Sequence, residues 1–154
     1  MKSRSNLSKE EVNGIIRKCE VCVVGMVDGE NGPYVLPFNF GFRDNRLYIH
    51  SGPEGKKIEL WEKDPRVCVS FSTDYQMRIQ NENVACSYSM RYKSVLLYGA
   101  VKQIENLEEK EQALNIIMEK YSGRSNFSYS KPALQNVSVF VIVPEKIESR
   151  SYGY

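Results

Sequence analysis

Short strand-like runs recur along this chain of 154 residues, and their spacing constrains the fold more than any other feature of its sequence. Each run is apolar or alternates between polar and apolar residues, and clusters of Gly, Pro, Asn and Asp separate one run from the next. We expect six strands, over residues 21–27, 33–42, 46–50, 66–72, 84–104 and 137–147. Because several runs follow each other at hairpin spacing, the pattern favours an antiparallel barrel over alternating strands and helices.

Helical periodicity marks two or three segments at the periphery of that barrel. Ser8 and Glu11 fit a capping box, and the apolar residues after them recur at helical spacing. A second helix is expected after Ser51, with its capping box completed by Glu54, and a third starts after Asn106. We therefore expect helices on the outside of a sheet that forms most of the fold.

The length suits one domain, which we assign to residues 1–154. A formal net charge of +2 and a pI near 8.3 lie far from the dense basic stripes of nucleic-acid-binding proteins, so no nucleic-acid partner is expected. No apolar run reaches the roughly 18 residues of a membrane span, and the start of the chain lacks the apolar core of a signal peptide. The sequence thus predicts a cytoplasmic protein. Residues 74–83 are polar and give no assignment, and residues 122–136 predict a loop.

Two of the four cysteines, Cys19 and Cys22, form a C-x-x-C pattern. A structural zinc site needs a second pair of ligands, but Cys68 and Cys86 stand far apart in strand-like runs and the chain has one histidine. A redox C-x-x-C usually opens a helix, whereas this one lies between a helix end and a strand start. Small buried thiols are therefore the favoured interpretation, and no metal site is expected.

Residues 50–57, His-Ser-Gly-Pro-Glu-Gly-Lys-Lys, join a predicted strand to a predicted helix, and we call them the junction. The free amides of a helix start, the positive end of its dipole, and the ammonium groups of Lys56 and Lys57 together favour an anion such as phosphate. An ordinary capped helix with solvated lysines fits the same pattern equally well. A triphosphate-binding P-loop does not, because Gly52 and Gly55 are too close and Lys57 stands where Ser or Thr would hold magnesium.

Other residues add to a possible ligand site. Pro37 cannot donate to a strand ladder, which predicts a sheet edge or bulge whose backbone groups are free to bind something else. Arg91 and Ser94 lie in a run rich in hydroxyls and positive charge. Such donors beside many aromatics suit a ligand with one phosphate and one flat ring. His50, the single histidine, is by its pattern more typical of a packed strand residue than of a catalyst.

The order of these motifs resembles a known family, the flavin-binding split-barrel proteins related to pyridoxamine 5′-phosphate oxidase, and within it the nitroimidazole-resistance (nitroimidazole reductase-like) branch. The resemblance extends from about residue 8 to 147. It rests on residues 23–34, the run Leu36-Pro37-Phe38-Asn39-Phe40, the junction, Asp64-Pro65, and Ser87-Tyr88 leading to Arg91-Tyr92-Lys93-Ser94-Val95. In two places the chain departs from the family: Ser149-Arg150 stands where a Gly-Lys pair often ends it, and the substrate-binding arginines of true pyridoxamine phosphate oxidases are not found, which argues against vitamin B6 oxidation.

The resemblance implies a six-stranded antiparallel split β-barrel with peripheral helices, a homodimer, and FMN bound at the subunit interface. It implies that the strand at 36–39 lies along the flavin ring, that His50 and Ser51 lie beside it, and that Lys56 and Lys57 meet the phosphate. Further polar contacts would come from the 87–94 segment. The implied cofactor-binding residues are Leu36, Pro37, Phe38, Asn39, His50, Ser51, Lys56, Lys57, Ser87, Tyr88, Arg91 and Ser94, with His50 also as the catalytic residue.

The expected activity is that of an oxidoreductase in which FMN takes electrons from NAD(P)H and passes them to a small acceptor such as a nitroaromatic compound. His50 would donate a proton or position the acceptor. Two other functions fit the same barrel: a flavin-binding or flavin-carrying protein without turnover, and a haem-binding protein. The single histidine makes the haem-binding alternative the weakest of the three.

Overall fold

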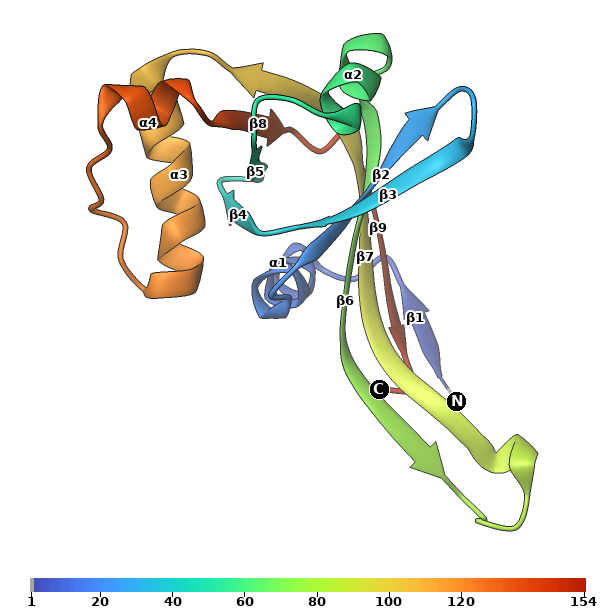
Figure 1. Cartoon of the computed structure of the whole chain (residues 1–154). Coiled ribbons are helices and arrows are strands. Elements are labelled where there is room, and N and C mark those ends of the chain that lie inside the picture. The colour runs from blue at the N-terminus through green and yellow to red at the C-terminus, as the bar shows by residue number, and fades with distance from the viewer. Residues whose placement is uncertain (1) are drawn as a thin grey trace.

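Antiparallel strands form the body of the molecule, and helices lie on its outside (Figure 1). The computed structural model describes residues 2–154. The strands are β1 (Ser3–Ser5), β2 (Cys22–Asp28), β3 (Gly32–Phe38), β4 (Phe40–Arg43), β5 (Arg46–Ser51), β6 (Arg66–Ile79), β7 (Tyr88–Ile104), β8 (Ser138–Ile142) and β9 (Lys146–Tyr152). The helices are α1 (Lys9–Lys18), α2 (Lys56–Lys63), α3 (Leu107–Ser122) and α4 (Lys131–Gln135), with a 3₁₀ turn, η1, at Ala85–Ser87.

The sheet is open, as in a split barrel. Its strand order is β3-β2-β6-β7-β8-β5-β4, and β9 pairs with both β7 and β1. The outermost strands of this path, β3 and β4, follow each other in the chain but each pairs with a different neighbour, β2 and β5 respectively. The predicted antiparallel split barrel is therefore confirmed, although the chain builds it from more than the six strands expected.

Two helix boundaries follow the predicted capping residues. At α1 the Ser8 hydroxyl accepts from the Glu11 amide at 3.2 Å and the Glu11 carboxylate accepts from the Ser8 amide at 3.0 Å, which is the expected capping box. At α3 the Asn106 side chain accepts from the Glu109 amide, and Gly123 ends the helix with a left-handed backbone at φ 71°. Both helices were found from local chemistry alone.

The predicted cap of α2 is wrong. Ser51 belongs to β5, and its hydroxyl donates to the Gly52 carbonyl at 2.8 Å instead of accepting from a helix amide. The helix begins at Lys56, and its N-cap residue is Gly55, whose φ of 121° only glycine adopts without strain. This glycine lets the chain turn sharply into α2, so Pro53 lies before the helix and not in its first turn.

Several predicted strands differ in extent. The 33–42 run is two strands broken at Asn39, and the 137–147 run is two strands broken around Pro144, which has no amide to donate to a ladder. The strand expected at 66–72 continues to Ile79, and the one expected from 84 begins at Tyr88 after η1. The sequence also gave no sign of β1, and α4 lies within the segment expected to be a loop.

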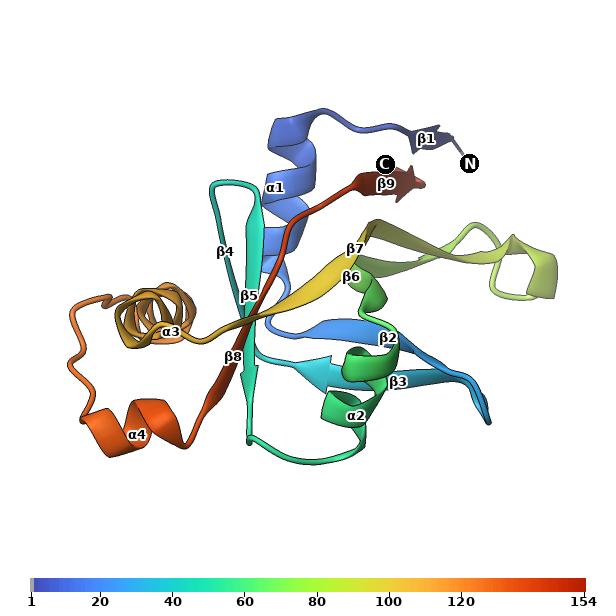
Figure 2. The same ribbon diagram turned by 90° about the horizontal axis from the view of Figure 1, so that it is seen from above.

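The core has two parts. Inside the barrel, the Trp61 ring of α2 lies between Phe140, at 4.9 Å between ring centroids, and Phe38, at 6.0 Å. A second, smaller cluster lies where α3 and α4 cover β8 and β5. Figure 2 shows α3 and α4 together on one side of the sheet, away from α2. Gly41 of β4 contacts α3 so closely that a Cβ atom there would lie 2.8 Å from the Ile117 amide nitrogen.

The cysteines are free thiols. Cys19 and Cys22 are buried, and burial raises the pKa of Cys22 to about 12. Within residues 2–154 no group of three or more His, Cys, Asp or Glu side chains could hold a metal ion. The burial of Cys19 and Cys22 agrees with their interpretation as small buried thiols. In the same part of the chain no helix is long and apolar enough to cross a membrane.

Candidate functional site

The junction is tied to the β2–β3 turn by an ion pair that the sequence did not reveal. Lys56 Nζ lies 2.7 Å from Asp28 Oδ2 and 4.6 Å from the centroid of the Tyr34 ring. Asp28 is buried and also accepts hydrogen bonds from the Glu30 amide and from the backbone and side chain of Asn31. The hydrogen bond from Lys56, followed by those from Asn31 and Glu30, holds the pKa of Asp28 far below its usual range. Lys56 is thus an anchor for α2.

Lys57, the next residue, is the cation that the junction leaves available. Its side chain is half-buried, and within residues 2–154 it makes no ion pair. Lys57 follows Gly55 and Lys56 at the start of α2, where backbone amides lack partners within the helix. Of the two predicted phosphate ligands, Lys57 is therefore the one whose charge is uncompensated.

His50 lies on the side of the sheet covered by α3 and α4. It pairs in register with Val139 and alternates with the buried Ile49, so it shares a face with Tyr48 and Val139 of the second core cluster. Its Nδ1 atom is buried and has no hydrogen-bond partner within the described chain. Burial lowers the pKa of His50, so the imidazole is neutral at neutral pH.

The edge strand β3 provides a row of backbone groups. It pairs only with β2, so its other edge makes no ladder within the described chain, as Pro37 predicted. Pro37 and Asn39 are exposed, Leu36 is partly buried against the core, and Phe38 is buried in it. The four predicted residues thus offer backbone atoms and two exposed side chains to a flat ligand.

The predicted residues Ser87, Tyr88 and Arg91 lie on a long hairpin formed by the outer parts of β6 and β7, and Ser94 follows it in β7. We call residues 74–93 the arm; Figures 1 and 2 show it extending away from the body of the sheet. Ser87 Oγ lies 2.6 Å from the Asn81 carbonyl, to which it donates, and Tyr88 donates to the Glu82 carbonyl at 3.0 Å. Both side chains therefore hold the loop at the tip of the arm.

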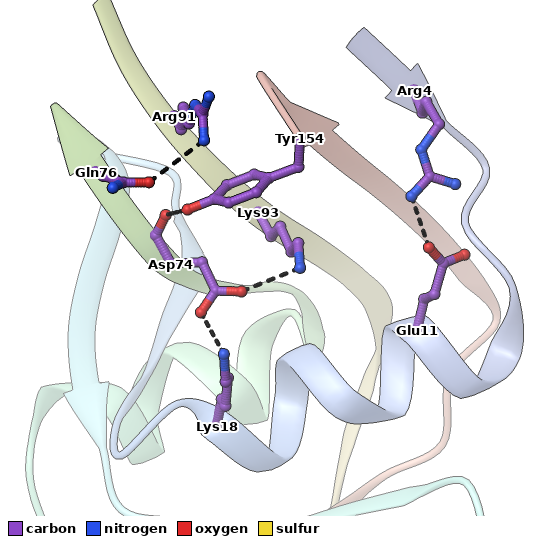
Figure 3. A network of polar contacts seen from close by, with 8 residues as sticks. All are labelled: Arg4, Glu11, Lys18, Asp74, Gln76, Arg91, Lys93 and Tyr154. Carbon is purple, nitrogen blue, oxygen red and sulfur yellow. Dashed lines mark hydrogen bonds and ion pairs between the residues drawn. The ribbon is translucent and has the colours of Figure 1, made fainter. Parts of the chain in front are cut away.

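Arg91 and Ser94, expected to act together, point to opposite faces of β7, because they are three residues apart in a regular strand. Figure 3 shows Arg91 on the same face of the arm as Gln76 and Lys93, which we call the polar face. Arg91 donates to the Gln76 side-chain oxygen at 3.4 Å, and its guanidinium carbon lies 5.4 Å from the centroid of the Tyr154 ring. The Nε of Arg91 is buried and makes no hydrogen bond with described residues. On the other face, Ser94 lines a hollow of about 440 Å³ between β7 and β9.

A second unpredicted carboxylate, Asp74, organises the polar face at the base of the arm (Figure 3). It pairs with Lys18 at 2.6 Å and with Lys93 at 3.1 Å, and its carbonyl accepts from the Tyr154 hydroxyl. Lys18 and Lys93 lower the pKa of Asp74. Local sequence shows no signal for either carboxylate network, because the partners of Asp28 and Asp74 are brought in by distant parts of the chain.

The predicted site residues therefore lie in three places on one chain, the free edge of β3, the junction, and the arm, with Ser94 in β7 just beyond the end of the arm. Figure 1 shows the junction helix α2 and the tip of the arm at opposite ends of the molecule. One chain does not gather them around a single cavity. The sheet is open and antiparallel, one helix packs over its end, and the other helices lie outside it. This arrangement makes the protein a member of the class of split β-barrel proteins.

A family model described as pyridoxamine 5′-phosphate oxidase matches residues 8–151, and the chain belongs to that family. A protein from Bacteroides thetaiotaomicron that is described as a candidate 5-nitroimidazole antibiotic resistance protein is 40% identical. The match covers 97% of this chain and 87% of that one, with a TM-score of 0.85. No curated protein matches the sequence.

Two more distant structures share the fold. A FAD-binding protein from Mesorhizobium loti is 24% identical over 99% of this chain and 100% of its own, with a TM-score of 0.69. A FAD- and haem-binding protein from Mycobacterium smegmatis is 18% identical over 97% of this chain and 74% of its own, with a TM-score of 0.83. The split barrel is thus common to proteins with different prosthetic groups.

Proposed function

We propose that this protein binds FMN and passes electrons from NAD(P)H to a small acceptor such as a nitroaromatic compound. The observation that carries the proposal is the 40% identity, over nearly the whole chain, to the Bacteroides protein linked to 5-nitroimidazole resistance. That match covers 97% of the chain, so it is not confined to one motif. We also propose a cytoplasmic location, with which four free thiols agree.

The residues present fit a flavin with one phosphate. Lys57 offers an uncompensated ammonium for the phosphate, and the free edge of β3 offers backbone donors and acceptors along a planar ring. The buried, unpartnered Nε of Arg91 is a polar atom that the flavin would satisfy, and the buried, unpartnered Nδ1 of His50 is one that the acceptor would satisfy. Bound FMN would supply the redox chemistry, accepting electrons from a nicotinamide and giving them to the acceptor.

His50 has two proposed roles in this scheme, and its surroundings favour one of them. Burial lowers the pKa of the imidazole, so at neutral pH it is uncharged and has one N–H donor and one acceptor nitrogen. A neutral imidazole is suited to holding an acceptor by a hydrogen bond, whereas proton donation needs the charged form. We therefore propose that His50 positions the acceptor.

We further propose that the protein is a homodimer with the flavin at the subunit interface. The outer face of the sheet supports this assignment, because the exposed residues Val23, Val27 and Val35 gather there on β2 and β3. On the same face, the hollow beside Ser94 lies between β7 and β9. Two copies placed face to face would bring the three separate groups of site residues around one ligand.

An FMN titration tests the cofactor. Lys57→Ala removes the free cation, and we expect its dissociation constant for FMN to rise roughly tenfold to a hundredfold, since charge-assisted hydrogen bonds contribute about 1.5–3 kcal/mol. Lys63→Ala, which removes an exposed lysine from the last turn of the same helix, is the matched control and should bind as the wild type does. Equal affinities for the two variants, or no FMN binding by the wild type, would contradict the proposal.

Steady-state reduction tests the activity. We expect NADH or NADPH to reduce the bound flavin, and a nitroaromatic acceptor to reoxidise it. A yellow protein that neither nicotinamide reduces would instead support flavin binding without turnover, and a Soret band in the purified protein would support haem binding. For His50→Ala we expect FMN affinity close to that of the wild type and a higher KM for the acceptor. Unchanged kinetics with every acceptor would remove His50 from the mechanism.

A further inference from the structure

A hollow of about 740 Å³ lies between α3 and the sheet, on the face of β5, β8 and β7 that the helices cover. Tyr48, Val141 and Lys102 form one row of its floor, because they pair in register across these three strands. The next row includes Val139 and Ile104, which the helices bury. Tyr48 and Val141 are only half-buried, and Lys102 is exposed. The helices therefore cover one row of the sheet and leave the neighbouring row open.

α3 forms the opposite wall of this hollow. Glu109, Gln112 and Ile116 line it, and their spacing of three and four residues places them along one stripe of the helix. A neighbouring stripe with Ala113 and Leu114 packs in the second core cluster, which fixes the first stripe toward the hollow. The wall thus changes along the helix from a carboxylate through an amide to an aliphatic side chain.

The charged side chains of the hollow have no partners among themselves. Two positive and two negative side chains line it: Arg46, Lys102, Glu105 and Glu109. Within residues 2–154 none of the four makes an ion pair or a side-chain hydrogen bond. Arg43, by contrast, pairs with Glu119 of α3. The sheet and α3 are therefore close enough for an ion pair at Glu119 but not across the hollow.

The two signs of charge enter from opposite ends of the hollow. Glu109 lies in the first turn of α3, and Glu105 directly precedes the capping residue of that helix. Arg46 pairs in register with Arg43, which contacts α3 near its other end, at Glu119. Since each helical residue adds 1.5 Å, the ten residues from Glu109 to Glu119 span about 15 Å. The hollow thus has an acidic end at the start of α3 and a basic end at the start of β5.

This distribution of charge selects among small ligands. Lys102 lies three residues before Glu105, so one ammonium and two carboxylates give the acidic end a net charge of −1. Arg46 gives the other end a charge of +1, and the lining as a whole is neutral. A ligand with charges of one sign would be repelled at one end. A neutral molecule with a separate ammonium and carboxylate is attracted at both.

The separation of the two ends sets the length of such a molecule. In a free amino acid both charged groups are attached to one carbon, so it cannot reach both ends. Three extended residues span up to about 10 Å, and the long side chains of Arg46 and Glu109 cover the rest. Between the ends, the Gln112 amide faces the peptide groups, and the side chains of Ile116 and Val141 form an apolar wall.

We propose that the hollow between α3 and the sheet binds a short peptide with both termini free. The peptide ammonium lies at Glu105 and Glu109, and its carboxylate lies at Arg46. None of the residues that line the hollow belongs to the proposed flavin site. The inference therefore goes beyond the proposed function and does not depend on it.

The test is calorimetric titration of the whole chain with the tripeptide Ala-Leu-Ala. We expect the free tripeptide to bind, and its N-acetylated and C-amidated forms to bind roughly tenfold or more weakly, because each has lost one charge. Free leucine should bind no better than the blocked peptides. Absence of binding by the free tripeptide, or equal binding of the blocked forms, would overturn the proposal.

Variants of exposed residues assign the two ends. We expect Arg46→Gln and Glu109→Gln each to raise the dissociation constant for the tripeptide roughly tenfold. Glu108→Gln is the matched control, since it removes an exposed carboxylate from the same turn of α3 outside the hollow, and it should bind as the wild type does. Equal affinities for Glu108→Gln and Glu109→Gln would contradict the proposed site.

Amide NMR shifts of the wild type locate the peptide without any variant. Addition of the tripeptide should move the amide signals of Tyr48, Gln112 and Ile116 and leave those of β2 and β3 in place. Shifts confined to other segments would exclude this hollow. An FMN titration keeps the two proposals separate, because Arg46→Gln should bind FMN as the wild type does. A chain that binds the tripeptide but no FMN would contradict the proposed cofactor alone, and the reverse result would contradict the peptide site alone.

Discussion

The junction and the arm carry the predicted site residues of this protein on very different supports. At the junction, α2 is held by the ring of Trp61 in the core and by the Asp28–Lys56 ion pair at its first turn. The arm has two strands, with one polar face that the Tyr154 ring covers in part and one face of half-exposed large side chains. The difference teaches that one chain can preorganise the proposed phosphate site at the junction, whereas its own residues leave one face of the arm largely uncovered.

The largest effect that tests the comparison of junction and arm is the loss of folding free energy when an aromatic side chain is removed from each region. Trp61→Ala removes a buried ring from the core, and we expect the free energy of unfolding to fall by about 3–5 kcal/mol. Tyr88→Ala in the arm removes a side chain that is 42% exposed, and we expect a loss of about 1 kcal/mol or less. Urea denaturation measures both. Similar losses for the two variants would mean that the arm is as well supported as the junction.

The Asp28–Lys56 pair should make the junction sensitive to acid. The folded-state pKa of Asp28 lies below its unfolded value of about 4, so its contribution to stability is present above that value and is lost as the pH falls through the folded pKa. We therefore expect Asp28→Asn to lower the thermal midpoint by several degrees at pH 7 and to flatten its dependence on pH below about 4. Glu30→Gln, in the same turn, should keep the wild-type profile. Parallel profiles for wild type and Asp28→Asn would exclude this role for the pair.

His50 provides a smaller effect with a clean readout, because it is the single histidine of the chain. Its folded-state pKa is depressed by burial, so neutral His50 contributes stability above the ordinary pKa of about 6.5, and this is lost as the pH falls. An NMR titration of its ring protons should therefore give a midpoint below 6.5, and His50→Gln should remove the matching loss of stability. A midpoint at or above the ordinary value would mean that the imidazole is more exposed to water than the structure indicates.

The smallest effect is expected at the tip of the arm. Ser87→Ala removes the hydroxyl that accepts from the Asn81 amide and donates to the Asn81 carbonyl in the loop at the tip. Global stability should change by less than about 1 kcal/mol, while limited proteolysis within residues 80–87 should become faster. Ser122→Ala at the end of α3 is a control that removes a hydroxyl elsewhere. If cleavage at the tip is no faster than in the control, Ser87 does not hold the loop.

The sequence predicted those parts of the fold that local chemistry decides. The Ser8 box, the Asn106 cap and the edge position of Pro37 each depend on residues close in the chain, and all three are confirmed. The predictions were wrong where a strand changes partners, because the break at Asn39 separates two strands that are set by pairing with β2 and β5. At Ser51 a common capping pattern competed with a glycine turn, and the glycine determined the start of the helix.

In the candidate site, too, features that depend on residues close in the chain were predicted, and contacts between distant residues were not. The order of motifs predicted site residues around the junction and in the arm, and these remain predictions, but it did not indicate which side chains lie next to them. Asp28 and Asp74 bind lysines that are 28 and 19 or more positions away, and alternation in β7 separates Arg91 from Ser94. Side-chain networks of this kind depend on the assembled sheet. Their members cannot be read from a run of neighbouring residues.

Gly41 sets a limit on how this barrel can vary. A methyl group there would fall within 3 Å of the backbone of α3, so every other amino acid would push the helix off β4. In a saturation library selected for soluble, folded protein, glycine should be the sole survivor at this codon, even though Gly41 is not among the proposed site residues. The distance between α3 and β4 is thus set by the lack of a side chain at Gly41.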